Sequence, residues 1–307
     1  FLNELINMPE LGTPVFKDSL PPVKLSGFSG LFFDRTQSND SIYVLYTVPD
    51  RGPNDDPVPM ARAMGAGNEF AFSDLRPFKL PNYQSRIVRF SYNKNTAKIT
   101  LDSQILLTRL QNDAIIPISG RTNVIGYDEI PVTYAKEGTN YSVADWVDTL
   151  TKVKYTELQF DPFGADIEGV LKDREGNFWI CDENRPSVYK LRPDGRMLVR
   201  YVPKGTSALG IIDLGPGSYG EETLPAVYRK RWANRGFEAI AYDSATHTIY
   251  AFIQSPIDNP ASNRNKTDVL RILGINAATG APVSEYVYLL ENNKDYAANL
   301  ALSRVDK

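Results

Sequence analysis

The sequence is poorest in histidine and cysteine. Its 307 residues include one histidine, His247, and one cysteine, Cys181. A single histidine excludes a histidine-rich zinc centre, and it allows a Ser-His-Asp triad or a Cys-His pair only if His247 itself takes part. His247 falls in a turn between two predicted strands, so we expect a solvated turn residue there. Cys181 has no partner for an intrachain disulfide and is expected to be a buried strand residue.

Long apolar runs and an excess of positive charge are also missing. No stretch of about 18 apolar residues occurs, so no transmembrane segment is predicted. The 34 basic and 37 acidic residues give a formal net charge of -3, which provides no basic field for nucleic-acid binding. The chain begins with Phe1 rather than methionine, and this suggests removal of a signal peptide or another upstream segment.

Short β-strand patterns dominate what is present. β-branched and aromatic residues form short runs separated by turn residues, with turns about every ten residues, as in antiparallel sheets. The predicted strands are Ser41–Tyr46, Arg86–Tyr92, Lys98–Leu101, Gln104–Leu107, Phe178–Cys181, Ser187–Leu191, Met197–Val202, Thr248–Ile253, Val269–Ile275 and Ser284–Leu289. We therefore expect an all-β protein.

One pattern occurs three times along the chain. An apolar strand leads through a polar turn to an aromatic strand and a polar exit, at Gly27–Pro53, Asp166–Pro186 and Gly236–Pro256. A module of this kind, repeated with long inserts, is typical of β-propeller blades. We predict one β-propeller domain over residues 1–307, with six blades favoured over five.

The inserts between these units carry two further expectations. Ser142–Val153 and Leu224–Trp232 each place apolar residues on one face at helical spacing, which predicts one or two short helices between blades. The proline-rich segment 51–84 is expected to be an irregular loop over one face of the propeller, where it could cover a substrate.

Acidic residues stand at equivalent ends of the three units. If blades stack around an axis, these ends converge, and clustered carboxylates need a cation. Ca²⁺ suits such a site, since it accepts six to eight oxygen ligands in irregular geometry. The predicted ligands are Asp50, Glu168, Asp182, Glu183 and Glu238, and the last four are also the candidate catalytic residues. The alternative is that each acid pairs with a nearby arginine or caps a turn.

Arginines accompany the acids in each unit, namely Arg51, Arg185 and Arg235. A guanidinium group matches a phosphate or a carboxylate in two-point geometry. A cation with arginines describes a site for a small anionic ester, in which the arginines stabilise charge that develops in the transition state. Here too the alternative is that each arginine pairs with the carboxylates of its own unit.

Four blocks of sequence resemble a known family. Their order and spacing, from about residue 25 to residue 290, are similar to those of the phytase-like family described as "esterase-like activity of phytase". The blocks are Ser29–Leu31 with Asp50–Asn54, Asp161–Gly169, Asp182–Gly195 and Asn234–Ala241. The resemblance implies a secreted or periplasmic, calcium-dependent β-propeller with phosphomonoesterase or other esterase activity. Asn54, in the first block, joins the three arginines as a candidate substrate-binding residue.

Other functions stay open at this point. The propeller of calcium-dependent alkaline phytases is a more distant likeness. Lactone-hydrolysing propellers with six blades also place glutamates on a central Ca²⁺, so a lactonase or carboxylesterase is an alternative. A non-catalytic extracellular propeller that binds a protein partner is a third hypothesis.

The C-terminus departs from the family pattern. Family members usually continue past a segment like Leu300–Lys307 with further strands, whereas this chain ends there. A propeller needs its last blade to meet its first, because an exposed blade invites association. We therefore predict that about one blade is missing. A second polypeptide, an N-terminal segment such as Phe1–Phe16 or a neighbouring copy would fill the gap.

Overall fold

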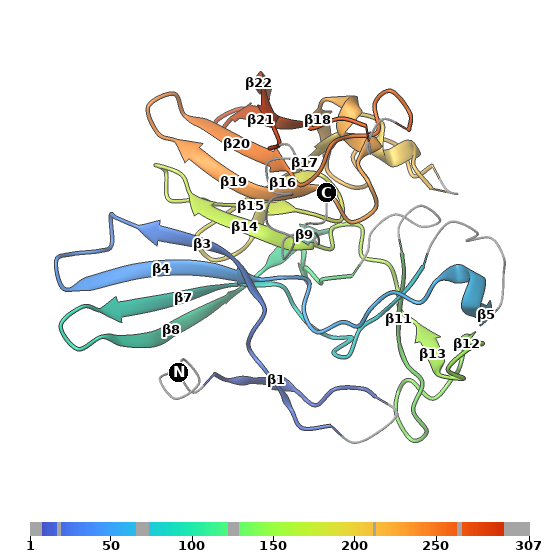
Figure 1. The fold of residues 1–307 in the computed structure, drawn as a ribbon. Helices are drawn as coiled ribbons and strands as arrows, with labels where there is room; N and C mark the ends of the chain where they lie inside the picture. Colours follow the sequence, from blue (N-terminus) through green and yellow to red (C-terminus); the bar gives the residue numbers. More distant parts are fainter. Residues whose placement is uncertain are drawn as a thin grey trace, which may run out of the picture.

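The computed structural model describes residues 8–16, 20–65, 74–121, 129–210, 213–262 and 266–291. These residues form strands and three short 3₁₀ helices without an α-helix, which confirms the all-β prediction (Figure 1). The elements are β1 (Glu10–Gly12), β2 (Val23–Lys24), β3 (Phe28–Asp34), β4 (Ile42–Pro49), η2 (Met60–Arg62), β5 (Ala63–Gly65), β6 (Leu75–Pro77), β7 (Arg86–Asn93), β8 (Lys98–Leu106), β9 (Thr108–Gln111), β10 (Ala114–Pro117), β11 (Ile130–Tyr134), β12 (Trp146–Asp148), β13 (Lys154–Glu157), β14 (Ile167–Lys172), β15 (Phe178–Asp182), β16 (Ser187–Leu191), β17 (Met197–Pro203), η4 (Thr206–Ala208), β18 (Glu221–Leu224), η5 (Ala226–Lys230), β19 (Phe237–Asp243), β20 (Thr248–Ile253), β21 (Val269–Asn276) and β22 (Pro282–Leu289).

Three sheets have the architecture of propeller blades. Their strand orders are β3-β4-β7-β8, β14-β15-β16-β17-β18 and β19-β20-β21-β22, and we call them the first, second and third blade. Each opens with one of the three repeated sequence units. The first strands of the blades lie side by side, with β14 between β3 and β19 (Figure 1). The predicted propeller architecture is therefore confirmed, and the preference for six blades over five stays a prediction.

Most predicted strands occur within a residue or two of their expected bounds. β16 and β20 match residue for residue. The segments Lys98–Leu101 and Gln104–Leu107 differ, because they form the single strand β8. Ser103 pairs with Arg89 and Leu101 with Phe90, so Asp102 is an extra residue in this strand. A β-bulge of this kind bends the strand and increases its local twist, while the strand continues past it.

The first predicted helix is wrong. Ser142–Val153 contains strand β12 and a turn instead. Its valines and threonines favour strands. Asp148 also accepts hydrogen bonds from the Leu150 N–H at 2.9 Å and the Thr151 hydroxyl at 2.8 Å, and such local bonds compete with a helix. In the second segment, Leu224 ends β18, and the helix that follows is the 3₁₀ helix η5.

The segment 51–84 is not irregular throughout. It contributes η2, β5 and β6. β5 and β6 form the two edges of a fourth sheet, with the order β5-β12-β13-β11-β6. β6 runs parallel to β11, and β5 runs antiparallel to β12. Both strands are only three residues long and lie at the edges of a sheet whose other strands come from a later segment. Strands this short show too little alternation of apolar and polar residues to be predicted from sequence.

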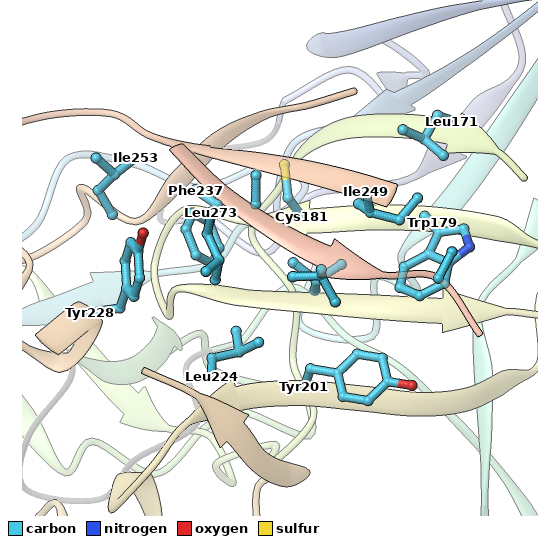
Figure 2. Close-up of a cluster of buried hydrophobic side chains, with 14 of the residues drawn as sticks. Leu171, Trp179, Cys181, Tyr201, Leu224, Tyr228, Phe237, Ile249, Ile253 and Leu273 are labelled. Atoms are coloured by element: carbon cyan, nitrogen blue, oxygen red, sulfur yellow. The ribbon is translucent and has the colours of Figure 1, made fainter. Parts of the chain in front are cut away.

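Apolar layers hold the blades together. Figure 2 shows the layer between the second and third blades, in which Trp179 and Tyr201 stack with ring centroids 6.1 Å apart. Cys181 lies in this layer as a buried thiol, as predicted. A second layer, which includes Val44 and Phe178, joins the first and second blades. Burial of apolar surface on both sides of the second blade is the main force that stacks the sheets.

His247 lies in the expected turn but is not solvated. It is 8 % exposed, and its Nδ1 lies 2.8 Å from the hydroxyl of Tyr242. Its backbone φ of 54° turns the chain sharply between β19 and β20. We infer that this turn brings the ring back onto the sheet.

The outer face of the first blade is covered in part by the N-terminal segment. Leu25 packs there with Val88 and Phe90, and Met8 and Leu11 add to this cluster. Residues 292–307, which include Leu300–Lys307, lie outside the described residues, as do residues 1–7. Completion of the propeller by a second polypeptide, by Phe1–Phe16 or by a neighbouring copy stays a prediction.

Glycines allow the first strands of neighbouring blades to approach closely. A Cβ atom on Gly30 would lie 2.8 Å from the Cα of Gly169, and one on Gly169 would lie 2.9 Å from Cγ2 of Ile240. Side-chain carbon atoms do not tolerate such distances without backbone movement. The junction of β3, β14 and β19 therefore depends on these two residues having no side chain.

We expect Gly30→Ala to destabilise the protein by about 1–3 kcal/mol, because its Cβ would have to push the first two blades apart. Urea unfolding followed by tryptophan fluorescence measures this change. Leu31→Ala is the matched control, since Leu31 is 71 % exposed and its truncation should cost less than about 0.5 kcal/mol. Equal stabilities of Gly30→Ala and the wild type would contradict the packing.

Candidate metal centre

Acidic residues meet where the first strands of the blades begin. Asp50 directly follows β4, Asp166 directly precedes β14, and Glu168 and Glu238 are the second residues of β14 and β19. One carboxylate oxygen from each of Asp50, Asp166 and Glu168 lies within 4.8 Å of the others. We call these three residues the acidic triad. Asp50 is far from Asp166 and Glu168 along the chain, so the stacking of the first two blades brings it to them.

A β-bulge occurs at the equivalent position of all three first strands. Ile167 pairs with Asp182 and Gly169 with Cys181, which leaves Glu168 as the extra residue. Glu238 is extra in β19 in the same way. In β3 the irregularity falls between Phe28 and Leu31, at Ser29 and Gly30. Bulges re-aim side chains at the ends of strands, and here they act on Ser29, Glu168 and Glu238.

Asp166 is the most unusual member of the triad. It is 2 % exposed, and no N–H or hydroxyl group of the described residues donates a hydrogen bond to its carboxylate oxygens, which face the carboxyl group of Asp50. Oδ2 lies 3.4 Å from Nη1 of Arg51. Burial raises the pKa of Asp166 well above its usual value, against the charge of Arg51. Buried polar atoms without partners are rare, and oxygen-only ligands beside one another fit a hard cation such as Ca²⁺.

The neighbouring glutamates share this electrostatic environment. Burial, followed by the charge of Asp50, raises the pKa of Glu168 to about 8, although a hydrogen bond with Ser29 opposes the shift. Burial and then Glu238 raise the pKa of Glu183 to about 7, against Arg235. Burial also raises the pKa of Glu238. These shifts reflect negative charge that is crowded and poorly solvated, and a bound cation would relieve it.

Glu183, Glu238 and Arg235 form the rim of the site. Glu183 accepts a hydrogen bond from Asn234 Nδ2 at 2.9 Å, and its other oxygen lies 3.6 Å from Arg235 Nη1. Arg235 also donates to Gln254 at 2.9 Å. Its side chain is 35 % exposed, so its guanidinium can reach a ligand. Oε2 of Glu238 is buried without a hydrogen-bond partner among the described residues.

Asp182 does not join this group, contrary to expectation. Its carboxylate pairs with Arg200 at 3.1 Å and accepts hydrogen bonds from the Tyr189 hydroxyl at 3.2 Å and the Arg185 N–H at 3.0 Å. These donors occupy the oxygens that a metal or substrate would need. Its position at the end of β15 turns it into the interior of the second blade. We therefore leave Asp182 out of the candidate site, both as a ligand and as a catalytic residue.

Three of the predicted substrate-binding residues are in positions that favour a structural role. Arg51 is buried, and its Nη1 lies 3.0 Å from Glu129 Oε2 as well as near Asp166. Arg185 is also buried. Asn54 donates to the carbonyl of Gly52 at 2.9 Å and accepts from Arg76 at 3.3 Å. The alternative of arginines pairing with nearby acids describes Arg51 better than substrate binding does.

Sequence reasoning missed four residues of the site. Asp166 lies two positions before Glu168 in the Asp-Ile-Glu-Gly block. Its closeness to a predicted ligand could have identified it as a further ligand. Aligning the three repeated units would have placed Ser29 at the position of Glu168. Asn234 precedes Arg235 in the chain, while Glu129 stands outside every repeated unit and no pattern marks it.

The buried pair of Asp182 and Arg200 yields a stability prediction. We expect Arg200→Met to destabilise the protein by about 3–5 kcal/mol, because it leaves a buried carboxylate without its charge partner. Thermal and urea unfolding measure the loss. Arg174→Met removes the partner of Glu175 from an exposed pair and should leave stability nearly unchanged. Similar losses in both variants would contradict a special role for the buried pair.

Comparison with known proteins identifies the family. Residues 23–305 match the phytase-like family described as "Esterase-like activity of phytase". A curated relative, an uncharacterised secreted protein of Arthroderma benhamiae, is 29 % identical over 278 residues, which cover 83 % of this chain and 49 % of the relative. The chain therefore spans about half the length of this relative. No helix among the described residues is long and apolar enough to cross a membrane.

Similar solved structures show only weak overall likeness. Hydrazine synthase of Kuenenia stuttgartiensis has a TM-score of 0.29 and 9 % identity, covering 68 % of this chain and 47 % of that one. The Cps50 (Swd1) β-propeller domain of Myceliophteria thermophila has a TM-score of 0.26 and 8 % identity, with coverages of 84 % and 72 %. A putative 6-phosphogluconolactonase of Bacteroides uniformis has a TM-score of 0.21 and 8 % identity, with coverages of 89 % and 88 %. These scores are too low to support an inference about function. The match over residues 23–305, together with the blades and the conjunction of acidic residues, shows that the chain belongs to the phytase-like family.

Proposed function

We propose that this chain carries the site of a secreted, Ca²⁺-dependent phosphoester hydrolase. The observation that supports this most directly is the acidic triad, with both oxygens of the buried Asp166 lacking hydrogen-bond donors among the described residues. The family description supports ester hydrolysis. Secretion is supported by the description of the Arthroderma benhamiae relative.

The triad of Asp50, Asp166 and Glu168 would hold the cation. A bound Ca²⁺ would neutralise the crowded carboxylates and polarise phosphoryl oxygens. Arg51 has a positioning role in this arrangement, because it lies between Asp166 and Glu129 and keeps the Asp166 carboxylate next to Asp50. Ser29 forms a hydrogen bond with Glu168 and so orients that side chain.

The rim would handle the substrate and water. Arg235 is partly exposed and lies beside Glu183, so it is placed to bind phosphoryl oxygens and to stabilise charge that develops on them. Glu238, with its Oε2 free of hydrogen bonds from the described residues, is the first candidate to accept a hydrogen bond from the attacking water. Glu183 is the second, because it is buried and its oxygens already face Asn234 and Arg235. Asp182 takes no part, because its oxygens are engaged with Arg200, Tyr189 and Arg185.

One feature favours a second candidate, a Ca²⁺-dependent lactonase or carboxylesterase. The site gathers acidic residues, while Arg51 and Arg185 are buried. A phosphate dianion is repelled by uncompensated carboxylates, whereas a neutral ester is not. The two candidates therefore differ in the charge of the substrate, and a non-catalytic propeller would hydrolyse neither.

Cation binding gives the first test. We expect Ca²⁺ to raise the thermal midpoint, by an amount equivalent to about 2.7 kcal/mol at a concentration 100 times its Kd. Asp166→Asn and Glu168→Gln should each remove most of this response, because each loses a charged ligand. Calorimetric titration and thermal unfolding in Ca²⁺ and in chelator measure the effect. Glu175→Gln, at an exposed turn away from the triad, is the control, and a shift of the same size in all variants would refute the site.

Hydrolysis gives the second test. We expect turnover of p-nitrophenyl phosphate or phytate that requires Ca²⁺ and is absent in EDTA. Arg235→Gln should lower kcat/KM by about 10–100-fold, since a charged hydrogen bond contributes about 1.5–3 kcal/mol, while the exposed control Arg174→Gln should have no effect. Turnover of p-nitrophenyl acetate or a lactone without turnover of phosphoesters would establish the second candidate. Full phosphoesterase activity in EDTA would exclude the proposed mechanism.

A further inference from the structure

The three blades share an equivalent position directly after their second strands. The residues that follow β4, β15 and β20 are Asp50, Glu183 and Gln254, and we call them the exit residues. The N–H of each exit residue donates a hydrogen bond of 2.9–3.0 Å to the carbonyl of the residue directly before the first strand of its blade. These acceptors are Gly27, Asp166 and Gly236. The exit side chains therefore start from matched backbone positions, at the end of the blades where the acidic triad lies.

Gln254 differs in charge from the exit residues of the other two described blades, which are acidic. Its Oε1 accepts a hydrogen bond from Arg235 Nη1 at 2.9 Å, and its side chain forms a second hydrogen bond with the carboxylate of Glu238. Because an ionised carboxylate only accepts hydrogen bonds, the amide nitrogen of Gln254 is the donor in the second one. A neutral side chain thus links the arginine and a glutamate of the rim.

The neutrality of Gln254 matters for the charge of Arg235. Oε1 of Glu183 lies 3.6 Å from the guanidinium, which is farther than the amide oxygen of Gln254 at 2.9 Å. A carboxylate at position 254 would form a charge-assisted pair with Arg235, in the geometry that the amide now uses. It would also add negative charge to a rim that already holds two glutamates. The amide binds the guanidinium without neutralising it.

We propose that Gln254 determines which substrate charge this site accepts, because its neutral amide keeps the charge of Arg235 available to a phosphate group. This inference rests on the proposed function. The charge of Asp50 helps to raise the pKa of Glu238, so the rim lies close to the triad. A phosphate group between the bound cation and Arg235 would then meet positive charge on both sides. The exit residue of the first blade serves the cation, and that of the third blade serves the anion.

The test compares a charged and a neutral substitution of Gln254. Calorimetric titration with inorganic phosphate in Ca²⁺ measures the affinity for the anion, and turnover of p-nitrophenyl phosphate separates KM from kcat. We expect Gln254→Glu to weaken phosphate binding about tenfold or more and to raise KM by a similar factor, because the new carboxylate pairs with Arg235. Gln254→Met keeps the position neutral and should change both quantities by less than about threefold.

Gln104→Glu is the matched control. Gln104 lies on β8, and its Oε1 also accepts a hydrogen bond from an arginine, with Arg86 Nη1 at 2.7 Å. The same change of charge there should leave phosphate affinity and KM unchanged. Both variants of Gln254 should keep the thermal response to Ca²⁺, because Gln254 is not part of the acidic triad.

Phosphate binding that is absent in the wild type, or equal in the wild type and Gln254→Glu, would overturn the inference. A loss in Gln254→Met as large as that in Gln254→Glu would also overturn it, since that result describes a purely structural residue. If Gln254→Glu does not fold, Gln254→Met decides: near-wild-type affinity supports the inference, and a loss as large as that in Arg235→Gln overturns it.

These results are separate from those that test the proposed function. Phosphoester turnover in Ca²⁺ that is insensitive to the charge of residue 254 would overturn the inference and leave the proposed function intact. If no phosphoester is hydrolysed, the proposed function fails, and the titrations with inorganic phosphate still decide whether Gln254 controls the binding of an anion.

Discussion

The close approach of three first strands is the constraint on which the rest of the structure depends. Gly30 and Gly169 leave no room for side chains between β3, β14 and β19. Apolar layers on both faces of the second blade then press the sheets together. Because the strands are so close, bulges at the start of each strand turn Ser29, Glu168 and Glu238 toward a shared region. Backbone packing thus creates the acidic site.

This packing crowds the negative charges of the acidic residues, and the protein compensates some of these charges more completely than others. Arg51 and Arg200 are buried next to Asp166 and Asp182, and they neutralise part of the charge from within the protein. The acidic triad is compensated less completely, since Asp166 lacks hydrogen-bond donors among the described residues and the pKa of Glu168 is raised to about 8, chiefly by burial. Asp182 with Arg200 is therefore a structural ion pair, whereas the acidic triad is suited to binding an added cation.

Local patterns made much of the fold predictable, and tertiary contacts explain what they could not. Strands such as β16 and β20 follow from alternation, and the repeated unit indicated blades whose acidic ends converge. The helix expected at Ser142–Val153 failed because β-branched residues and the bonds of Asp148 favour a strand and a turn. Asp166 and Asp182 are both aspartates near the end of a strand, so their sequences look alike. Only the folded chain shows that Asp182 pairs with Arg200. Sequence predicts which acids stand near the ends of strands, whereas burial and partners decide which of them can bind a ligand.

The claim that the triad holds a cation is tested most directly by a crystal structure of the protein grown with Ca²⁺, with anomalous scattering used to identify the ion. The account predicts a calcium peak about 2.3–2.6 Å from carboxylate oxygens of Asp50, Asp166 and Glu168. A well-ordered structure at saturating Ca²⁺, with these three side chains in the described positions and no anomalous peak between them, would contradict it.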